Sequence, residues 1–237
     1  MNSVWSIGAK TAEKLTNLKI NSMYDLAHTN PFFIKEKFGV IGSQLFALSW
    51  GVDRSIISNK YIPKSKSYGN SQVLPKNYSN KQEIETVLKE LAEQVGARLR
   101  SHSIACTVVN LNVGFSYKLR KQGRKGFGHS MKIDATNSNK ELKKHIIKLF
   151  EDKWRGEEVR NIAFSCSKLV DDNIEQLDLF DSRDLKHKNK QLDKTVDSIR
   201  KKYGFKSIVN LDSKSKGATA INRAGLVGGH AGGNSYE

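Results

Sequence analysis

The sequence predicts an α+β fold, in which a small all-α bundle precedes a four-stranded antiparallel sheet with two helices on one face. Two observations predict it. Short, capped helical segments fill residues 1–62, and the order strand, helix, strand, strand, helix, strand (β-α-β-β-α-β) follows them. At 237 residues with 38% hydrophobic side chains, the chain can bury one good core or two small ones. We expect three regions, namely residues 1–62, 63–170 and 171–237.

The first region contains start and stop signals for four short helices. In chain order these signals are Gly8 before an apolar stripe, a Ser22 and Asp25 capping box, an Asn30 N-cap before Pro31, a Gly39 stop and a helical run from Ser43 to Trp50. We therefore predict an all-α bundle. The stretch 60–71, which alternates Lys and Ser around a proline, is typical of an extended linker.

The second region changes its hydrophobic period. Alternation of apolar and polar residues indicates strands, and apolar stripes at spacings of three and four indicate helices. The expected elements are strands at 68–74, 109–115, 130–134 and 162–166 and helices at 80–99 and 138–154. The two helices are expected to begin at the N-caps Asn80 and Ser138. Their stripes would cover one face of the sheet and leave the other to solvent or a ligand.

The distribution of charge points to a polyanionic partner. The formal net charge is +16, and residues 66–170 hold 20 of the 40 basic residues but only 10 of the 24 acidic ones. Lys and Arg that neutralise phosphates release condensed counterions, so a basic sheet with one polar face suits a nucleic-acid backbone. The loop from Lys118 to Gly126 places five cations between two strands. A solvated hairpin tip is the alternative interpretation of that loop.

Two further stretches could bind a partner. Gly8, Ala9 and Lys10 open a helix whose first N–H groups could hold a phosphate, although a glycine before a helix is more often a simple turn. The QLDLF segment at 176–180 puts large apolar side chains into an acidic stretch. They could enter a groove of a partner protein or fold back on their own domain.

Other chemistries find little support in the sequence. Cys106 and Cys166 stand in no disulfide or zinc motif, and the six histidines lack metal-ligand spacing. No apolar stretch approaches the roughly 18 residues of a membrane span, and the N-terminus lacks the features of a signal peptide. We expect a cytoplasmic protein that binds no cofactor of its own.

Several segments together resemble the Y-family translesion DNA polymerases. Residues 4–15, 38–39 and 50–53 resemble the thumb domain of that family, and residues 67–170 resemble the little finger domain of its bacterial UmuC-like branch. Residues 176–180 resemble the family's clamp-binding pentapeptide. Residues 199–204 and 228–230 resemble the C-terminal extension of Gram-positive members. The segments follow one another in the family's order. The chain is therefore similar to the C-terminal half of such a polymerase.

This resemblance implies roles for individual residues. Contacts to primer–template DNA are implied for Gly8, Ala9 and Lys10 in the thumb and for Ser67, Asn70, Arg120, Lys121, Arg124, Lys125, Ser130 and Lys132 in the little finger. Docking on the bacterial sliding clamp is implied for Gln176, Leu177, Leu179 and Phe180. Such DNA binding would recognise shape and charge rather than base sequence, as a polymerase that accepts damaged template requires.

The resemblance also implies what the chain lacks. Polymerases hold two metal ions, here expected to be Mg²⁺, on carboxylates of the palm domain. The family's N-terminal metal-binding aspartate and its later Ser-x-Asp-Glu motif have no counterpart in this sequence. We interpret the chain as the non-catalytic, DNA-binding half of a polymerase of DNA repair and the SOS response. Palm and fingers would be further partners, and no membrane association is expected.

Two other functions stay open at this point. An RNA-binding module with the same strand and helix order would need outward aromatic rings on its central strands, and the stretch from Lys125 to Gly128 hints at one. An adaptor whose only role is clamp docking would use the QLDLF segment and not the basic body.

Overall fold

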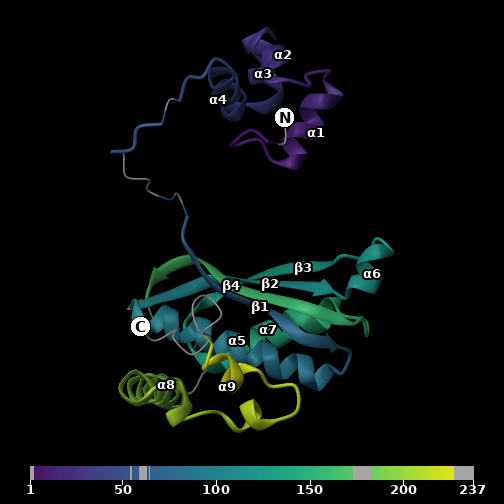
Figure 1. Cartoon of the computed structure of the whole chain (residues 1–237). Coiled ribbons are helices and arrows are strands. Elements are labelled where there is room, and N and C mark those ends of the chain that lie inside the picture. The colour runs from purple at the N-terminus through teal and green to yellow at the C-terminus, as the bar shows by residue number, and fades with distance from the viewer. Residues whose placement is uncertain (1–2, 54, 59–62, 64, 173–182, 227–237) are drawn as a thin grey trace. The chain divides into compact units, whose positions relative to one another are not determined.

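The computed structural model describes residues 3–53, 55–58, 63, 65–172 and 183–226. The chain forms two compact units, residues 1–62 and residues 63–237 (Figure 1). Each unit has its own hydrophobic core. The second unit contains the sheet together with the described part of the C-terminal region.

Short helices build the first unit around a small apolar core. They are α1 (Ala9–Asn17), α2 (Met23–Ala27), α3 (Pro31–Phe38) and α4 (Val40–Ser49). The core side chains come from the predicted stripes and from the turns between the helices: Ile7, Ala12, Leu15, Ile20, Leu26, Ile34 and Leu45. The predicted all-α bundle is therefore present, with its fourth helix starting three residues earlier than expected.

Local signals explain where these helices begin and end. Ser22 and Asp25 form the expected reciprocal capping box. The side chain of Asn30 accepts a backbone N–H of the first turn of α3, and Gly39 separates α3 from α4 with a φ of 64°. At Gly42 an added Cβ would lie 2.3 Å from a backbone oxygen of α3, so the two helices pack too closely for a larger residue.

The second unit is built on a four-stranded antiparallel sheet. Its strands are β1 (Ser67–Tyr78), β2 (Ile104–Phe115), β3 (Gly126–Thr136) and β4 (Val159–Asp171), in the spatial order β1-β4-β2-β3. This confirms the predicted α+β class and its strand order in the sequence. The expected linker was too long, because β1 already pairs with β4 at Ser67.

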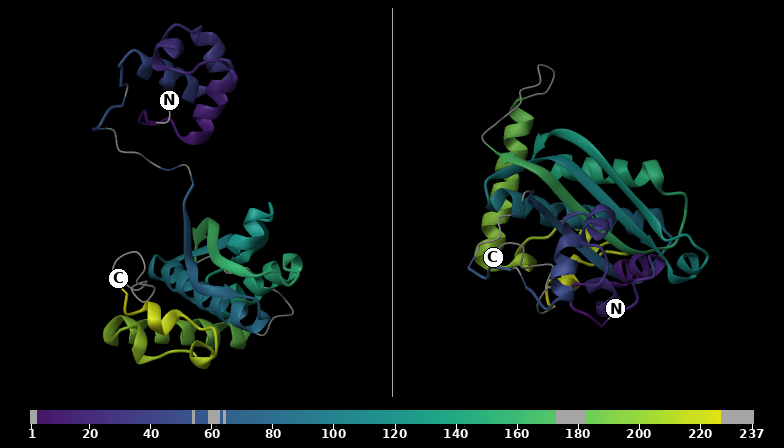
Figure 2. Two further views of the ribbon diagram at one scale, coloured as in Figure 1. Left: turned by 45° about the vertical axis from the view of Figure 1, so that its right-hand side comes forward. Right: turned by 90° about the horizontal axis from the view of Figure 1, so that it is seen from above.

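Two long helices, α5 (Lys81–Ser101) and α7 (Asn139–Lys153), cover one face of this sheet (Figures 1 and 2). Asn80 caps α5 by accepting the N–H groups of Gln82 and Glu83. The predicted stripe of α5 is fully buried at every position: Ile84, Val87, Leu88, Leu91, Val95 and Leu99. Each such side chain contributes about 1.5–3 kcal/mol of burial free energy, which fixes α5 on the sheet.

A third layer lies on the outer side of α5. It consists of α8 (Arg183–Tyr203), the short 3-10 turns η1 (Phe205–Ser207) and η2 (Leu211–Lys214), and α9 (Ala220–Arg223) (Figure 2). From the sequence, the apolar residues Val196, Ile199, Tyr203 and Phe205 predict a helix that packs on the thumb or on the palm. In the structure it packs on α5, and the contacts are largely charged.

Two arginines connect this third layer to α5. Arg100 on α5 donates to the carboxylate of Asp197 through two nitrogens at 2.6 and 3.0 Å, and its side chain is only 4% exposed. Arg200 on α8 donates to the carboxylate of Glu93 at 2.6 Å. Lys143 on α7 also donates to Glu93, at 2.9 Å. The layer is therefore held by buried ion pairs rather than by an apolar stripe.

The start of α7 differs from the prediction in one detail. Ser138 is its N-cap residue, as expected, but its side chain makes no capping hydrogen bond. Asp193 of α8 accepts the backbone N–H and the side-chain amide of Asn139 instead, both at 2.9 Å. A carboxylate at a helix N-terminus is favourable because the free N–H groups carry partial positive charge.

The connection between β2 and β3 also differs from the prediction. It was expected to be a basic loop, but residues Tyr117–Lys121 form a short helix, α6 (Figure 1). Lys, Leu and Arg are good helix formers, which explains the turn of helix. Gly123, with a φ of 84°, then returns the chain to β3.

Candidate nucleic-acid interface

The face of the sheet opposite α5 and α7 is free of any helix of the described residues 65–172 and 183–226 (Figure 2). Strand register sets its side chains in rows across the four strands. One row joins Ser67, Ser167, Val108 and Lys132, and the next joins Gly69, Ser165, Asn110 and Ser130. These positions carry mostly small or neutral polar side chains. We call this surface, formed by the outward positions of β1 to β4, the open face.

Asparagine amides lie across neighbouring strands on the open face. Asn110 donates to the hydroxyl of Ser167 at 3.1 Å and to a β4 carbonyl. A Cβ at Gly114 would lie 1.8 Å from an oxygen of Asn161, and a Cβ at Gly128 would lie 2.8 Å from an oxygen of Asn112. The asparagine amides lie over these glycines, which have no side chain of their own, and the surface stays low enough for a bulky ligand to approach the strands.

The predicted DNA-contacting residues of the strands do not all share this face. Ser67, Ser130 and Lys132 lie on the open face and are exposed. Asn70 lies on the opposite face, where its amide donates to the side chain of Gln94 on α5. The structure therefore places Asn70 against the helices and away from the other three.

The predicted cations lie around α6, at one end of the sheet. Arg120, Lys121 and Lys125 are exposed. Arg124 donates to the carboxylate of Glu157 at 2.5 Å, and that carboxylate is 9% exposed. Arg124 is thus engaged in holding the hairpin to the start of β4, which leaves less of its charge for a ligand.

The first turn of α1 lies in the other unit. Gly8 has an extended backbone, with a φ of −77° and a ψ of 165°. Thr11 and Ala12 donate to the Gly8 carbonyl at 2.9 and 3.0 Å, whereas the N–H groups of Ala9 and Lys10 have no backbone acceptor in the described part of the chain. No atom lies within 4 Å of a Cβ built at Gly8. This turn is therefore accessible to an anion.

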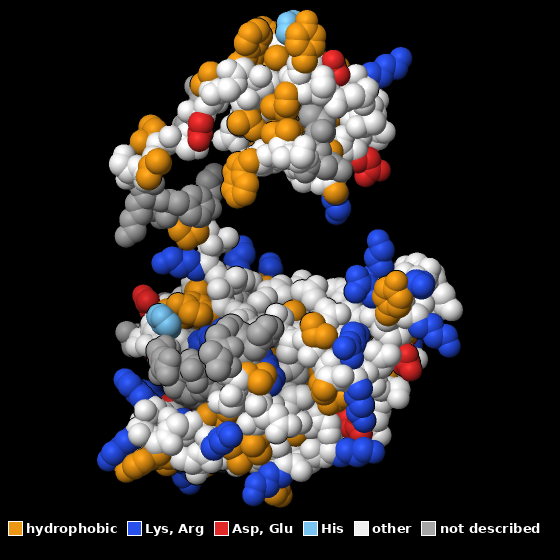
Figure 3. All heavy atoms as spheres, viewed as in Figure 1, with side chains coloured by type: hydrophobic (Ala, Val, Ile, Leu, Met, Phe, Trp, Pro, Cys, Tyr) orange, Lys and Arg blue, Asp and Glu red, His pale blue; other side chains and the backbone are white. Residues whose placement is uncertain are grey.

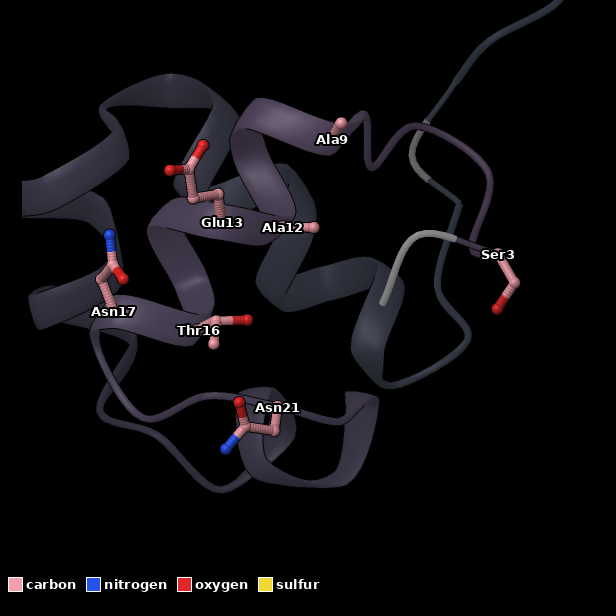
Figure 4. A pocket seen from close by; sticks show the side chains of 7 residues that line it. All are labelled: Ser3, Ala9, Ala12, Glu13, Thr16, Asn17 and Asn21. Carbon is pink, nitrogen blue, oxygen red and sulfur yellow. The ribbon is translucent and has the colours of Figure 1, made fainter.

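A shallow depression lies beside α1 (Figure 4). Its lining residues are Ser3, Ala9, Ala12, Glu13, Thr16, Asn17 and Asn21. Glu13 is the one charged side chain in this lining. The depression therefore lacks the cations that a phosphate site needs. Of the predicted DNA contacts Gly8, Ala9 and Lys10, only Ala9 is among its lining residues.

No aromatic side chain stands on the open face of the central strands between Val108 and Gly114 or between Asn161 and Ser167, where the outward residues are Ser, Asn, Ala, Gly and Val. Phe127 on β3 faces the helices, packs on the core and contacts the ring of Phe115 with centroids 6.1 Å apart. The hint of an RNA-binding platform near Phe127 is therefore not supported by the side-chain directions.

The remaining predicted residues fall outside the structural description. Gln176, Leu177, Leu179 and Phe180 all lie within residues 173–182, which are not described. Within the described ranges, no group of three or more His, Cys, Asp or Glu side chains is placed to hold a metal ion.

None of the helices in the described part of the chain is both long and apolar enough to cross a membrane.

Some residues of the interface were not singled out in the sequence. Asn110, Asn112, Asn161, Ser165 and Ser167 all lie on the open face. The alternation of residues 109–115 already marked Asn110 and Asn112 as outward. For the β4 residues the same period was readable, but the strand neighbours that complete the rows could not be known without the register.

Comparisons with known proteins agree with this architecture. Residues 65–179 match the impB/mucB/samB family C-terminal domain. The chain is 32% identical over 231 residues to UvrX of Bacillus subtilis, which is named as a UV-damage repair protein. The aligned residues cover 97% of this chain and 54% of UvrX. It is 31% identical over 228 residues to DNA polymerase IV 2 of Halalkalibacterium halodurans, covering 96% and 54% of the two chains.

A solved structure supports the same fold. A chimera of the Y-family DNA polymerases Dbh and Dpo4 aligns with a TM-score of 0.50 at 18% sequence identity, covering 72% of this chain and 47% of that chain. The relatives with which this chain shares its sequence are named as a UV-damage repair protein and as a DNA polymerase. The chain belongs to the Y-family DNA polymerases and corresponds to their C-terminal part. It spans about half the length of the curated relatives it matches.

Proposed function

We propose that this chain binds primer–template DNA through its sugar–phosphate backbone, without sequence preference, as the non-catalytic part of a translesion polymerase. The observation that carries the proposal is the open face. Its small and neutral polar side chains would let a duplex lie close to the strands, where Ser and Asn groups can donate to phosphate oxygens. Cations at Lys132 and around α6 would add the electrostatic attraction.

The thumb residues would contribute a second contact. The N–H groups of Ala9 and Lys10 at the start of α1, which have no acceptor among the described residues, offer two donors for one phosphate, and the Lys10 side chain adds a positive charge. Because the two units are joined by a linker, we propose that they bind the same duplex as separate modules.

A salt titration tests the DNA-binding proposal. The affinity of the whole chain for a primer–template duplex should fall by roughly 0.9 log units per log unit of salt for each phosphate neutralised. Ser130→Glu, which places a carboxylate on the open face, should weaken binding strongly. Ser198→Glu makes the same change on an exposed position of α8 and should leave the affinity nearly unchanged. Absent or salt-insensitive duplex binding would overturn the proposal.

We also propose that the segment at 176–180 docks on the bacterial sliding clamp. Its apolar anchors at Leu179 and Phe180 suit a hydrophobic groove, and the Gln176 amide suits hydrogen bonding at the groove's edge. Replacing Leu179 and Phe180 by alanine should abolish clamp binding and spare duplex binding. If the two activities disappeared together, the separation of the two sites would be wrong.

The remaining partners follow from the relatives. Palm and fingers domains would supply the metal-binding carboxylates and the polymerase chemistry. The relatives named above are bacterial, and bacterial DNA lies in the cytoplasm, so we propose a cytoplasmic location. Clamp binding without any DNA binding would instead favour the adaptor function.

A further inference from the structure

The hairpin between β2 and β3 ends in a small knob that is firmly built. We define the knob as residues 117–126, which contain α6 and the turn back to β3. Leu119 packs on the core of the sheet, and its carbonyl accepts the N–H of Arg124 at 3.0 Å. At the neck, Ser116 donates its N–H to the carbonyl of Glu158 at 2.9 Å, and Arg124 pairs with Glu157. The knob is therefore held at both of its ends.

Positive charge dominates this knob. Its ten residues contain five cations and no acidic side chain. Within the described part of the chain, Lys118, Arg120 and Lys125 form no ion pair, and all three are exposed. Figure 3 shows Lys and Arg side chains gathered around a hydrophobic one at the end of the sheet where α6 lies. Uncompensated cations on a rigid base favour an anionic ligand.

A large aromatic ring stands among these cations. Tyr117 is 69% exposed, although it begins a helix whose next apolar residue, Leu119, reaches the core. The ammonium of Lys121 lies 4.9 Å from the centroid of the Tyr117 ring. This contact restrains the ring and leaves most of it open to solvent. Tyrosine loses little conformational entropy on binding, so a restrained, exposed ring is well suited to a contact surface.

We propose that the knob binds unpaired DNA, with a base stacked on Tyr117 and the flanking phosphates bound by Lys118 and Arg120. This inference rests on the DNA-binding function proposed above and adds a contact for single strands, which shares the cations around α6 with the duplex and differs from it by the Tyr117 ring. Stacking on an aromatic ring needs a base whose face is accessible, and every base has such a face. A duplex keeps its base faces stacked inside, so it could meet only the cations.

Charge also separates this ligand from a protein partner. A protein that docked on the knob would need an acidic surface to match its cations as well as a surface that packs on the ring. Unpaired DNA provides both parts at once, because each nucleotide carries a phosphate and a base. A single strand is therefore the ligand whose chemistry uses every exposed group of the knob.

The test compares two chains of equal length that differ only in their bases. The whole protein is titrated with oligothymidylate and with an abasic deoxyribose phosphate chain, both fluorescently labelled. The wild type should bind oligothymidylate at least about fivefold more tightly than the abasic chain, because stacking contributes roughly 1–3 kcal/mol per base. Tyr117→Ala should remove this preference, and Tyr117→Phe should retain it.

A matched control exists elsewhere in the chain. Tyr203 on α8 is 65% exposed, and the ammonium of Lys202 lies 5.1 Å from its ring centroid. Tyr203→Ala removes a ring of the same kind and should leave the preference for bases unchanged. Lys118→Gln and Arg120→Gln should each lower the salt dependence of single-strand binding by roughly 0.7 log units per log unit of salt.

The outcomes separate this inference from the function on which it rests. Equal affinity of the wild type for the two single strands, or no effect of Tyr117→Ala on their difference, overturns the stacking role while duplex binding stands. The stacking role is also overturned if Tyr117→Ala and Tyr203→Ala lower the preference for oligothymidylate over the abasic chain equally. Absence of duplex binding in the wild type would instead overturn the proposed function. Tyr117→Ala should keep wild-type duplex affinity, which also shows that the variant is folded.

Discussion

Replacing Arg100 by methionine should release the third layer from α5 without disturbing the sheet. Besides its two bonds to Asp197, the guanidinium donates to the carbonyl of Asn137 at 2.7 Å and lies 3.5 Å from the carboxylate of Asp193. Methionine keeps most of the apolar stem of the arginine and removes its charge. The two aspartates, both on α8, would then lose their shared cation.

The size of the effect follows from the burial of these groups. Breaking a fully buried ion pair by removing one partner costs about 3–5 kcal/mol. The Arg100 side chain is 4% exposed, but those of Asp193 and Asp197 are 12% and 19% exposed, so water can solvate part of the charge that is left. We therefore expect the free energy that holds the third layer on α5 to fall by an amount near the lower end of this range, about 3 kcal/mol. This raises the population of the undocked layer roughly 100-fold.

Hydrogen exchange of the whole protein, read by peptide, is the appropriate assay, because two units need not unfold as one. In Arg100→Met, amides of α8 should lose about 100-fold protection, whereas those of β2 and β4 should keep theirs. The control is Lys81→Met, which breaks a 2.5 Å ion pair to Glu151 whose side chains are 47% and 46% exposed. It should leave exchange almost unchanged. Unchanged α8 protection, or parallel loss in the strands, would refute the reasoning.

Two other predictions concern pH and backbone conformation. Burial of Glu93 acts to raise its pKa, but the charges of Lys143 and Arg200 outweigh it and the pKa is lowered. Stability from this group is therefore present above the ordinary value of 4.5 and is lost as pH falls through the lower folded pKa. Glu93→Gln should flatten that part of the pH profile of unfolding, and an unaltered acid limb would contradict this. Gly126→Ala should destabilise the hairpin by more than about 1–3 kcal/mol, because a Cβ at a φ of 136° would lie 2.0 Å from a β2 carbonyl oxygen. Gly123→Ala, with open space at a φ of 84°, should cost only about 1 kcal/mol, and equal midpoints in urea unfolding would show that the close approach is unimportant.

The sequence predicted those elements whose signals are local. The period of two around Leu111 and Val113 gave the direction of β2, and the stripe ending at Leu99 gave the buried face of α5. Period also explains one error. Ser67 and Asn70 are three residues apart in a strand, so their side chains must point to opposite faces, and both could not have lined one surface. The structure accordingly places Asn70 against Gln94.

Contacts between distant segments could not be predicted in the same way. Ser138 had every local feature of a helix cap, yet Asp193, 54 residues away from Asn139, provides the capping oxygen. The knob was expected to be a loop between two strands, although the run from Lys118 to Lys121 consists of good helix formers. Local helix propensity was readable there and was not used.

The polar side of α5 shows why the helix side of the sheet is not available to a polyanion. Glu90 and Glu93 lie off the apolar stripe, so their spacing is that of a solvated face, yet both are buried. Glu90 accepts the N–H groups of Thr219 and Ala220, and burial raises its pKa. The carboxylates on the polar side of α5 thus bind cations and backbone N–H groups of the third layer. Of the cations of the knob, Arg124 pairs with Glu157, whereas Lys118, Arg120 and Lys125 form no ion pair among the described residues. Since the helix face is covered twice, a polyanion can reach this unit most directly across the open face and the knob.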